Sequence, residues 1–301
     1  MRTTKPTRKP PAQARLPRRK KARSHSYADN SRGIRLQKAL AEAGVDSRRH
    51  CEEMILEGRV RVNDEIVQDL PAWVDPEKDR IFIDGKPLKK PRRRKSTGEI
   101  VHQYVLLNKP AKIVCTNRDP EDRQRAIDLV RLPGKPRLFC VGRLDAESTG
   151  LLLLTTDGEL ANHLTHPRYG VHKTYEVVLK GSLDEEDVAK LAKGIFITDR
   201  RRGLADRTAP VELTLLKRDR ERTHLRMELR EGRNRQIRRM MARLGHPVKR
   251  LTRIQLGPLK LKGIAIGEWR FLTAREKQSL FRAAQNEKIR PTHNDCRSEN
   301  N

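Results

Sequence analysis

The stretch LFCVGRLDAESTGLLLLTTDGELANHL, residues 138–164, decides how the larger part of this chain folds. Its two apolar runs, 138–141 and 151–154, have the length and composition of buried strands. A short polar loop between them contains Asp145 and is bracketed by two glycines, which accept close approaches that other residues resist. The pattern predicts a carboxylate that is held firmly between two strands and faces a cleft.

The residues around Asp145 indicate its role. A single Asp in a loop is usually a turn former or a helix cap. The complete string GRLDAESTGLLLLTTDG, however, resembles the signature of the pseudouridine synthases, specifically the RsuA-like branch that modifies ribosomal RNA. The Asp of GRLD is catalytic in that family, so the resemblance assigns this role to Asp145. The resemblance includes the string NKP at 108–110 and covers about residues 34–280.

The charge of the chain indicates a polyanionic partner. The 301 residues carry a formal net charge of +28 at pH 7, an excess typical of proteins that bind nucleic-acid phosphates. A membrane surface is the alternative, but the sequence shows neither a basic amphipathic helix with a broad apolar face nor an apolar run of membrane-spanning length. The four cysteines form no CxxC pair, so we expect no zinc site, no disulfide framework and a reducing cytoplasm.

Changes in composition divide the chain into five segments. Residues 1–32 form a basic arm that is expected to be disordered, because it has few large apolar residues to bury. An RNA tether is the favoured role for this arm over a solubilising tail or a transit peptide, whose amphipathic helix its prolines would spoil. The other segments are a small domain at 33–88, a linker at 89–100, a larger domain at 101–284 and a disordered tail at 285–301.

The small domain is expected to contain two helices followed by a small sheet. Its strings IRLQKALAEAGVDSRR and GRVRVN resemble the S4 RNA-binding domain. By that resemblance its RNA-facing surface is lined by Arg35, Lys38, Ser47, Arg48, Arg49, Arg59 and Arg61. Each basic residue alone is more often a solvated surface residue, but as a group on adjacent elements they favour RNA. Such phosphate contacts position a protein and carry little sequence information.

The larger domain is predicted to be rich in strands. We expect a strand, turn and strand around the NKP string, a strand at 173–181 and an antiparallel pair formed by 211–217 and 223–232. Helices are expected after the caps Asp157 and Ser182, and over the string RQIRRMMARLG. The absence of regular βαβ alternation predicts an α+β fold: a small S4-like domain and a larger, mainly antiparallel mixed-sheet pseudouridine synthase domain.

The implied reaction, uridine to pseudouridine in RNA, needs no redox change and no phosphate energy. We expect no cofactor and no metal, because the sequence has no phosphate-binding glycine loop and no metal-ligand cluster. Asp145 could attack the sugar C1′, attack the uracil C6, or remove the C2′ proton. Each route needs an ionised carboxylate in a water-poor pocket, although burial alone would raise its pKa.

The family supplies the cation that keeps this carboxylate charged. A basic residue in its RQIR segment pairs with the catalytic Asp, and here that residue is Arg238. Its alternative role is a phosphate contact on an arginine-rich helix. Arg143 is a second candidate partner, but as a near neighbour of Asp145 it would often point the opposite way.

The family also implies the residues that receive the uridine. Tyr175 would stack on the base and help remove the C5 proton, and Ile237 would form an apolar wall of the pocket. The alternative for Tyr175 is a half-buried strand residue with its hydroxyl at the edge. The uridine must be flipped out of its RNA helix, at roughly a few kcal/mol. Candidates for the contacts that repay this cost are Arg233, Asn234, Arg235 and Arg239.

The leading hypothesis is a ribosomal RNA pseudouridine synthase that acts as a cytoplasmic monomer. The string DPEDR at 119–123 and the end of the GRLD string resemble family members that modify large-subunit (23S) RNA more than the member that modifies small-subunit RNA. A small-subunit RNA pseudouridine synthase stays the alternative. A non-catalytic RNA-binding or ribosome-assembly factor on the same fold would have lost Asp145, Tyr175 or Arg238, and all three are present. A glycoside-cleaving enzyme would need a second carboxylate, for which Glu147 is the nearby candidate.

Overall fold

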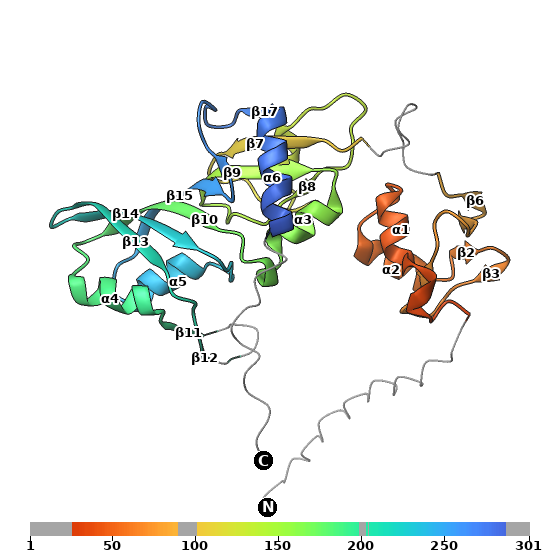
Figure 1. Cartoon of the computed structure of the whole chain (residues 1–301), viewed down its shortest axis with the longest axis horizontal. Helices are drawn as coiled ribbons and strands as arrows, with labels where there is room; N and C mark the ends of the chain where they lie inside the picture. The colour runs from red at the N-terminus through yellow and green to blue at the C-terminus, as the bar shows by residue number, and fades with distance from the viewer. Residues whose placement is uncertain (1–25, 90–100, 199–202, 204, 287–301) are drawn as a thin grey trace, which may run out of the picture. The chain divides into compact units, whose positions relative to one another are not determined.

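The computed structural model describes residues 26–89, 101–198, 203 and 205–286 of the chain. These residues form two compact units, one within residues 1–97 and the other within residues 98–301 (Figure 1). Most of the expected arm, linker and tail lie outside the described residues. None of the helices in the described part of the chain is long and apolar enough to cross a membrane.

The first unit packs two helices against a small antiparallel sheet, as predicted. The buried residues Leu36 and Leu40 of α1 meet Cys51 and Ile55 of α2 in a single core. Ser47 is the N-cap of α2, and its hydroxyl accepts a hydrogen bond from the His50 backbone N–H at 3.1 Å. The elements are α1 (Leu36–Glu42), α2 (Arg48–Leu56), β1 (Ile34–Arg35), β2 (Val60–Val62), β3 (Glu65–Ile66), β4 (Trp73–Val74), β5 (Ile81–Ile83) and β6 (Lys86–Pro87).

Residues 26–32 belong to this first unit, whereas the sequence pattern assigns them to a disordered arm. Tyr27 is buried in the core, and its hydroxyl donates a hydrogen bond to the Val62 carbonyl oxygen at 3.0 Å. The Trp73 N–H donates to the Tyr27 carbonyl oxygen at 2.8 Å, and Asn30–Arg32 forms a short 3-10 helix, η1. One aromatic residue hardly changes the composition of a basic stretch, but it anchors the segment once a core is available.

The second unit is built on a nine-stranded sheet with the order β13-β14-β10-β15-β9-β7-β17. Short strands β8 and β16 pair with β9 and β15. All of its pairings are antiparallel except that of β15 with β9, which confirms the predicted mainly antiparallel mixed sheet. The strands are β7 (Tyr104–Lys109), β8 (Phe139–Cys140), β9 (Thr149–Thr155), β10 (Lys173–Lys180), β13 (Glu212–Arg218), β14 (Arg222–Leu229), β15 (Val248–Leu256), β16 (Leu259–Lys260) and β17 (Trp269–Phe271).

The four consecutive leucines of β9 are all fully buried because both faces of this half of the sheet are covered. Leu151 and Leu153 pack with helices α3 (Gly158–Thr165) and α6 (Ala274–Asn286) on one face. Leu152 and Leu154 pack on the other face with residues of the loops 113–138, which contain the 3-10 helix η2 (Ala126–Leu129). A strand buried on both faces is a continuous apolar run rather than an alternating one.

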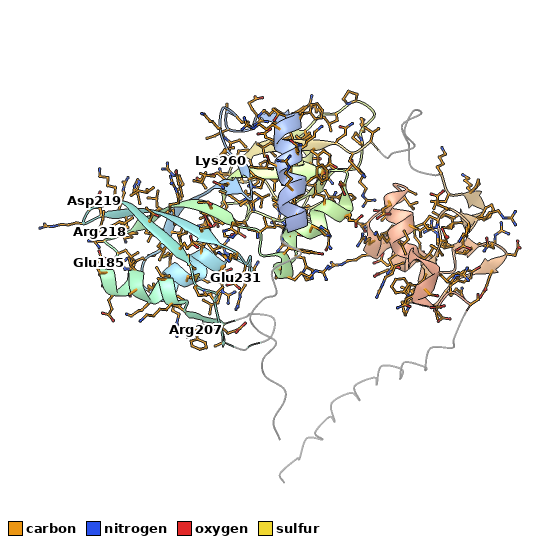
Figure 2. The ribbon with its side chains drawn as sticks, in the orientation of Figure 1. Glu185, Arg207, Arg218, Asp219, Glu231 and Lys260 are labelled. Carbon is orange, nitrogen blue, oxygen red and sulfur yellow. The ribbon has the colours of Figure 1, made fainter. Side chains whose placement is uncertain are left out.

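The other half of the sheet, β13, β14, β10 and β15, is covered by helices α4 (Glu185–Lys193) and α5 (Gln236–Arg243). Ile237, Met240 and Met241 of α5 are buried against it, as their helical spacing predicts. The Arg218 Nη1 lies 2.8 Å from a Glu185 carboxylate oxygen and joins the end of β13 to the start of α4 (Figure 2). A separate hairpin, β11 (Phe196–Thr198) and β12 (Ala205–Arg207), completes this half.

The two halves of the sheet meet where β15 runs parallel to β9. Only Thr252 with Thr149 and Arg253 with Gly150 are in register there. Gly150 has φ +101°, and a Cβ at this position would lie 2.3 Å from the Arg253 carbonyl oxygen. This contact is the close approach expected of a glycine beside the GRLD string, and it brings the loop before β9 next to β15.

Two local predictions are wrong. Residues after NKP do not form a strand, because the carbonyl oxygens of Pro110 and Ile113 accept hydrogen bonds from the Lys109 ammonium instead of joining a ladder. The N-cap of α4 is Asp184 rather than Ser182: its carboxylate accepts from the Asp187 N–H at 2.7 Å. The Leu183 N–H, which a cap at 182 would place inside the helix, donates to the Thr223 hydroxyl at 2.9 Å.

Candidate active site

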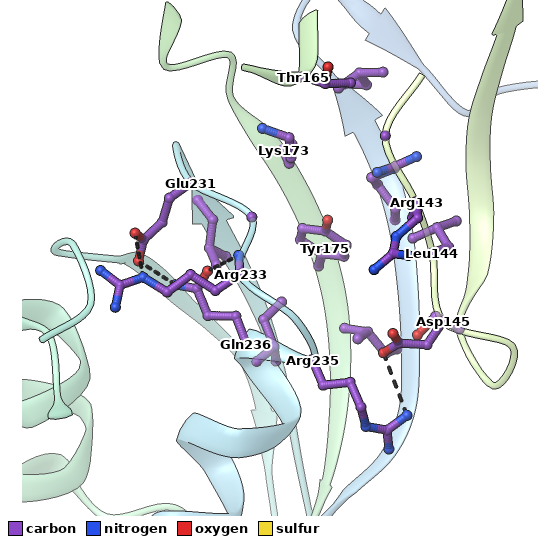
Figure 3. Close-up of a pocket in the computed structure, with 18 of the residues that line it drawn as sticks. Arg143, Leu144, Asp145, Thr165, Lys173, Tyr175, Glu231, Arg233, Arg235 and Gln236 are labelled. Atoms are coloured by element: carbon purple, nitrogen blue, oxygen red, sulfur yellow. Dashed lines mark hydrogen bonds and ion pairs between the residues drawn. The ribbon is translucent and has the colours of Figure 1, made fainter. Parts of the chain in front are cut away.

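A cleft of about 140 Å³ lies at the junction of the two half-sheets. The loop of residues 141–148, here called the GRLD loop, forms one wall, and the segment 229–237 before and within α5 forms the other. Tyr175 of β10 lies between these walls (Figure 3). The cleft therefore collects residues from segments that are far apart in the chain.

Asp145 lies in the GRLD loop between β8 and β9, and its side chain is 26% exposed. The backbone is held at Asp145 and at the next residue: the Ser148 N–H donates to the Asp145 carbonyl oxygen at 3.0 Å, and the Lys112 N–H donates to that of Ala146 at 2.7 Å. The carboxylate is thus rigidly placed while its oxygens still face the cleft, as the sequence pattern predicts.

Two guanidinium groups flank the Asp145 carboxylate. The Arg238 Nε lies 3.9 Å and the Arg235 Nη1 lies 3.8 Å from the same oxygen, Oδ2. Both distances are longer than a hydrogen bond, so the carboxylate is charge-compensated while its oxygens keep the capacity to accept other bonds. Glu147 shares the same two cations, at 3.2 Å from Arg235 and 3.6 Å from Arg238.

Arg238 is the more buried of the two arginines. Its side chain is 13% exposed, against 40% for Arg235. Its Nη1 donates to the Val248 carbonyl oxygen at 3.3 Å, and its buried Nε has no hydrogen-bond partner within the described residues. Burial and the bond to β15 hold the Arg238 guanidinium in place beside Asp145.

Arg235 reaches the cleft through an unusual backbone conformation. It is the N-cap residue of α5 and has φ 49° and ψ 35°, in the left-handed region, which costs a non-glycine residue about 1–3 kcal/mol. The turn before it is tied down by Gln236, whose Oε1 accepts from the Arg233 N–H at 3.0 Å and whose Nε2 donates to Glu231 at 2.6 Å. This turn directs Arg235 across the cleft to Asp145 (Figure 3).

Arg233 does not point into free space as an RNA contact would. Its Nε donates to Glu231 at 3.0 Å, its Nη1 to Asp206 at 2.9 Å and its Nη2 to the Arg207 carbonyl oxygen at 2.8 Å. Every guanidinium nitrogen is therefore occupied, and Nη1 and Nη2 join the hairpin β11–β12 to the cleft wall. Asn234 is exposed, and its carbonyl oxygen accepts from Arg239 at 3.2 Å.

Tyr175 and Ile237 both line the cleft, as the family resemblance implies. Tyr175 is half-buried and packs against the apolar clusters of both half-sheets. Ile237 is buried and supplies apolar wall. Arg143 is exposed and also lines the cleft, but within the described residues it forms no ion pair with Asp145.

The basic residues expected on the S4-like unit lie on its surface or at its edges. Arg48 and Arg49 are exposed at the start of α2. Arg35 lies over the Trp73 ring and Arg61 over the Phe82 ring, at 5.1 and 4.3 Å from the ring centroids. The remaining two are paired: Lys38 with Glu42 at 3.6 Å, and Arg59 with Asp84 at 2.7 Å. Ser47 is occupied as the helix cap described above.

Lys109, the lysine of NKP, is a site residue to which the sequence pattern assigned no role. It is fully buried, and its ammonium donates to the carbonyl oxygens of Pro110 at 2.8 Å, Ile113 at 2.8 Å and Ala146 at 3.3 Å. Burial lowers the pKa of Lys109 to about 8. Because Ala146 follows Asp145, this buried lysine braces the GRLD loop from behind.

Two thiols lie behind the same loop. A hydrogen bond from Cys140 lowers the pKa of the Cys115 thiol. The Leu144 N–H also points at the Cys115 sulfur, at 3.5 Å, and acts in the same direction. Cys115 thereby adds a further anchor to the GRLD loop.

Known protein families match both units. Residues 103–243 match the family model described as RNA pseudouridylate synthase, and residues 34–70 match that of the S4 domain. Among solved structures, a crystal structure of a pseudouridylate synthase is 30% identical and superposes with a TM-score of 0.57, covering 82% of this chain and 100% of that one. The fold and the two-domain composition implied by the sequence resemblance are confirmed.

Two relatives align over most of the chain. An uncharacterized RNA pseudouridine synthase of Aquifex aeolicus (strain VF5) is 40% identical over 252 residues, which cover 83% of this chain and 94% of that protein. The ribosomal large subunit pseudouridine synthase B of Bacillus subtilis (strain 168) is 38% identical over 249 residues, covering 82% and 95%. Identity at this level over nearly the whole of both relatives shows that the chain belongs to the RNA pseudouridine synthase family, with an S4 domain ahead of the synthase domain.

Proposed function

We propose that this protein isomerises specific uridines of large-subunit ribosomal RNA to pseudouridine, with Asp145 as the catalytic carboxylate. The observation that carries the proposal is the position of Asp145 in a cleft, between two guanidinium groups and beside an aromatic ring. The choice of RNA rests on relatives that are named as ribosomal large subunit pseudouridine synthases B. An RNA substrate also agrees with the net charge of +28.

The reaction breaks the N1–C1′ bond of uridine, turns the base and joins its C5 to C1′. Asp145 acts in its ionised form, because each available route begins with a carboxylate that donates electrons: to C1′, to C6 of the base, or to the C2′ proton. Arg238 and Arg235 stabilise this anion, whose side chain is 26% exposed, so water screens the attraction only in part. Their distances near 4 Å leave the carboxylate oxygens accessible to the nucleoside.

Tyr175 and Ile237 receive the base. The Tyr175 ring offers a flat surface for stacking on the uracil, and its hydroxyl can help to remove the C5 proton after the new bond forms. The buried side chain of Ile237 excludes water from the same space. Arg143, exposed at the rim of the cleft, is placed to meet the RNA backbone.

The target uridine has to leave its RNA helix before Asp145 can reach C1′, at a cost of roughly a few kcal/mol. Exposed groups next to the cleft, such as Asn234, are placed to hold the flipped strand. Arg233 acts differently from our expectation, by positioning the wall that carries Arg235. The S4 domain adds phosphate contacts through its exposed arginines. We expect a monomer that acts in the cytoplasm; light scattering tests the first point and fluorescence microscopy of the tagged protein the second.

Pseudouridine mapping in ribosomal RNA tests this function. Cells that lack the protein should lose pseudouridine at one or a few positions of the large-subunit RNA, and the wild-type protein should restore them. Asp145→Asn should restore none while binding the RNA with unchanged affinity. Asp122→Asn, a matched change at an exposed loop position of the same domain, should restore all.

The outcomes separate the parts of the proposal. Loss of pseudouridine from small-subunit RNA instead would show that the substrate is wrong. Full restoration by Asp145→Asn would remove this residue from the chemistry. An unchanged pseudouridine map in cells without the protein would leave it as a binding factor.

A further inference from the structure

Arg253 of β15 is a buried cation at the floor of the cleft. Its side chain is 1% exposed, yet it lines the same cleft as Asp145 and Tyr175. Arg253 and Tyr175 are directly opposite each other on the adjacent strands β15 and β10. Residues opposite each other in an antiparallel pair project from the same face of the sheet, so the guanidinium and the tyrosine ring share the face that forms the cleft.

The hydrogen bonds of Arg253 are incomplete. Its Nε donates to the Leu151 carbonyl oxygen at 2.8 Å, but its buried Nη2 has no hydrogen-bond partner among the residues that the structure describes. Within the described part of the chain no Asp or Glu carboxylate lies within 4.0 Å of this guanidinium. A buried charge without a counter-charge, with an unmade hydrogen bond, is costly to a folded protein. A structural brace for Leu151 would not require this cost, because it uses only Nε.

Other cationic side chains near the cleft already have hydrogen-bond or ion-pair partners. Lys109 donates to three carbonyl oxygens behind the GRLD loop, and the Lys173 ammonium donates to the Val171 carbonyl oxygen at 2.8 Å. Arg235 and Arg238 flank the carboxylates of Asp145 and Glu147. The Arg238 Nε is also buried without a hydrogen-bond partner, but it faces the Asp145 carboxylate. Among the described residues, Arg253 thus differs from these cations in having a buried, unpaired N–H group at the cleft and no carboxylate within 4.0 Å.

We propose that Arg253 is a catalytic residue whose Nη2 donates a hydrogen bond to a carbonyl oxygen of the target uracil and stabilises the negative charge of the base during its transfer. This inference rests on the proposed function and adds a second charged group to it. Asp145 acts on the sugar or on C6, and Arg253 acts on the oxygen atoms of the base.

The electron balance of the reaction requires such a group. When the N1–C1′ bond breaks, its electron pair stays on the uracil and spreads over N1, O2 and O4, while Asp145 bonds to C1′ or accepts the C2′ proton. Addition of Asp145 to C6 also pushes an electron pair onto the base oxygens. The later C5–C1′ bond uses that pair, while the bond from Asp145 to C1′ or C6 breaks or Asp145 returns the C2′ proton. C5 then loses its proton and N1 gains one, so the isomerisation is balanced and Asp145 is regenerated. The guanidinium itself transfers no proton, because it stays charged throughout.

Rates on two RNAs test this role. A fragment of large-subunit RNA that contains the mapped target is transcribed with UTP or with 5-fluoro-UTP. Cleavage of the N1–C1′ bond of the target by the full-length protein is followed in single turnovers, because the fluorinated base has no C5 proton to lose and its reaction stops after the C5–C1′ bond forms. Arg253→Met should slow uridine conversion by about 100-fold or more, the usual effect of losing one donor to a developing oxyanion. The loss should be much smaller on 5-fluorouridine RNA, since fluorine withdraws electrons and itself stabilises the detached anion. Arg253→Lys should recover part of the rate.

Arg250→Met is the matched control, because Arg250 is exposed on the same strand. It should leave both rates unchanged. An equal loss by Arg253→Met on both RNAs, or a loss of RNA affinity without a loss of rate, would overturn the proposal by showing a structural role. If Arg253→Met does not fold, the same comparison with Arg253→Lys decides in the same way. A wild-type protein inactive on both RNAs would instead contradict the proposed function, and the inference with it.

Discussion

The Arg238 Nε and the Asp145 Oδ2 face each other across the cleft at 3.9 Å, from a helix and a loop that lie far apart in the sequence. Arg238 is largely buried, while Arg235, at a similar distance from the same oxygen, is three times more exposed, 40% against 13%. An ion pair is stronger where less water screens it. The two arginines should therefore contribute unequally to the reactivity of Asp145.

Arg238→Met should slow single-turnover pseudouridine formation by about 100-fold or more, because Asp145 loses the partner that solvent screens least. Arg235→Met should cost about 10-fold or less, since solvent screens the attraction of this more exposed guanidinium. Rates measured at saturating protein give this comparison free of changes in RNA affinity. A larger loss for Arg235→Met than for Arg238→Met would reverse the assignment of the main partner.

Tyr175→Phe and Tyr175→Leu separate the two roles of this residue. Phe keeps the ring that packs between the half-sheets and offers a stacking surface, but it loses the hydroxyl. It should retain RNA affinity and slow the chemical steps. Leu removes the ring as well and should also weaken binding of the target RNA, by about 1–3 kcal/mol for the missing base stack. Equal rates for Phe and wild type would exclude the hydroxyl from proton transfer.

The lowered pKa of Lys109 predicts that the free energy of unfolding depends on pH. Burial lowers its pKa from 10.5 to about 8, so between these values the unfolded chain keeps a proton that the folded protein has released. The free energy of unfolding of the wild type should therefore rise with pH relative to Lys109→Met, by at most about 1.4 kcal/mol per pH unit. Below pH 8 the difference should be constant. Urea unfolding of both proteins from pH 7 to 10 measures it, and a flat difference across that range would contradict the lowered pKa.

Arg48 and Arg49 test the RNA-binding role of the first unit. Both are exposed, and neither forms an ion pair within the described residues. Arg48→Gln with Arg49→Gln should weaken binding of the target RNA and reduce the slope of log affinity against log salt by about 1 for each phosphate that the variant no longer neutralises. Lys78→Gln, an exposed lysine that pairs with Asp75 at 3.3 Å, is the control and should leave the slope unchanged. An unchanged slope in the double variant would place the RNA elsewhere.

Local features were predictable because they depend on neighbouring residues alone. Asp157 caps α3 by accepting from the Glu159 and Leu160 N–H groups, as its position in the sequence indicates. The predicted hairpin of β13 and β14 is present. Predictions failed where a residue far away in the sequence binds a local group. The Thr223 hydroxyl accepts the hydrogen bond of the Leu183 N–H, and the core of the first unit buries Tyr27.

The sequence by itself determined the GRLD loop, the placement of Asp145 between two strands and the family, because these follow from a contiguous string. Only the second of the two runs is buried throughout, since Phe139 and Cys140 of β8 are partly exposed. Which cation meets which anion was decided only by the tertiary structure. Five arginines at 233, 235, 238, 239 and 253 look alike in the sequence, yet Arg233 turns to Asp206, Arg235 and Arg238 turn to Asp145, and Arg253 is buried beneath the cleft. The physical reason is that the parallel pairing of β15 with β9 and the left-handed turn at Arg235 set the direction of each side chain, and neither can be seen from nearby residues.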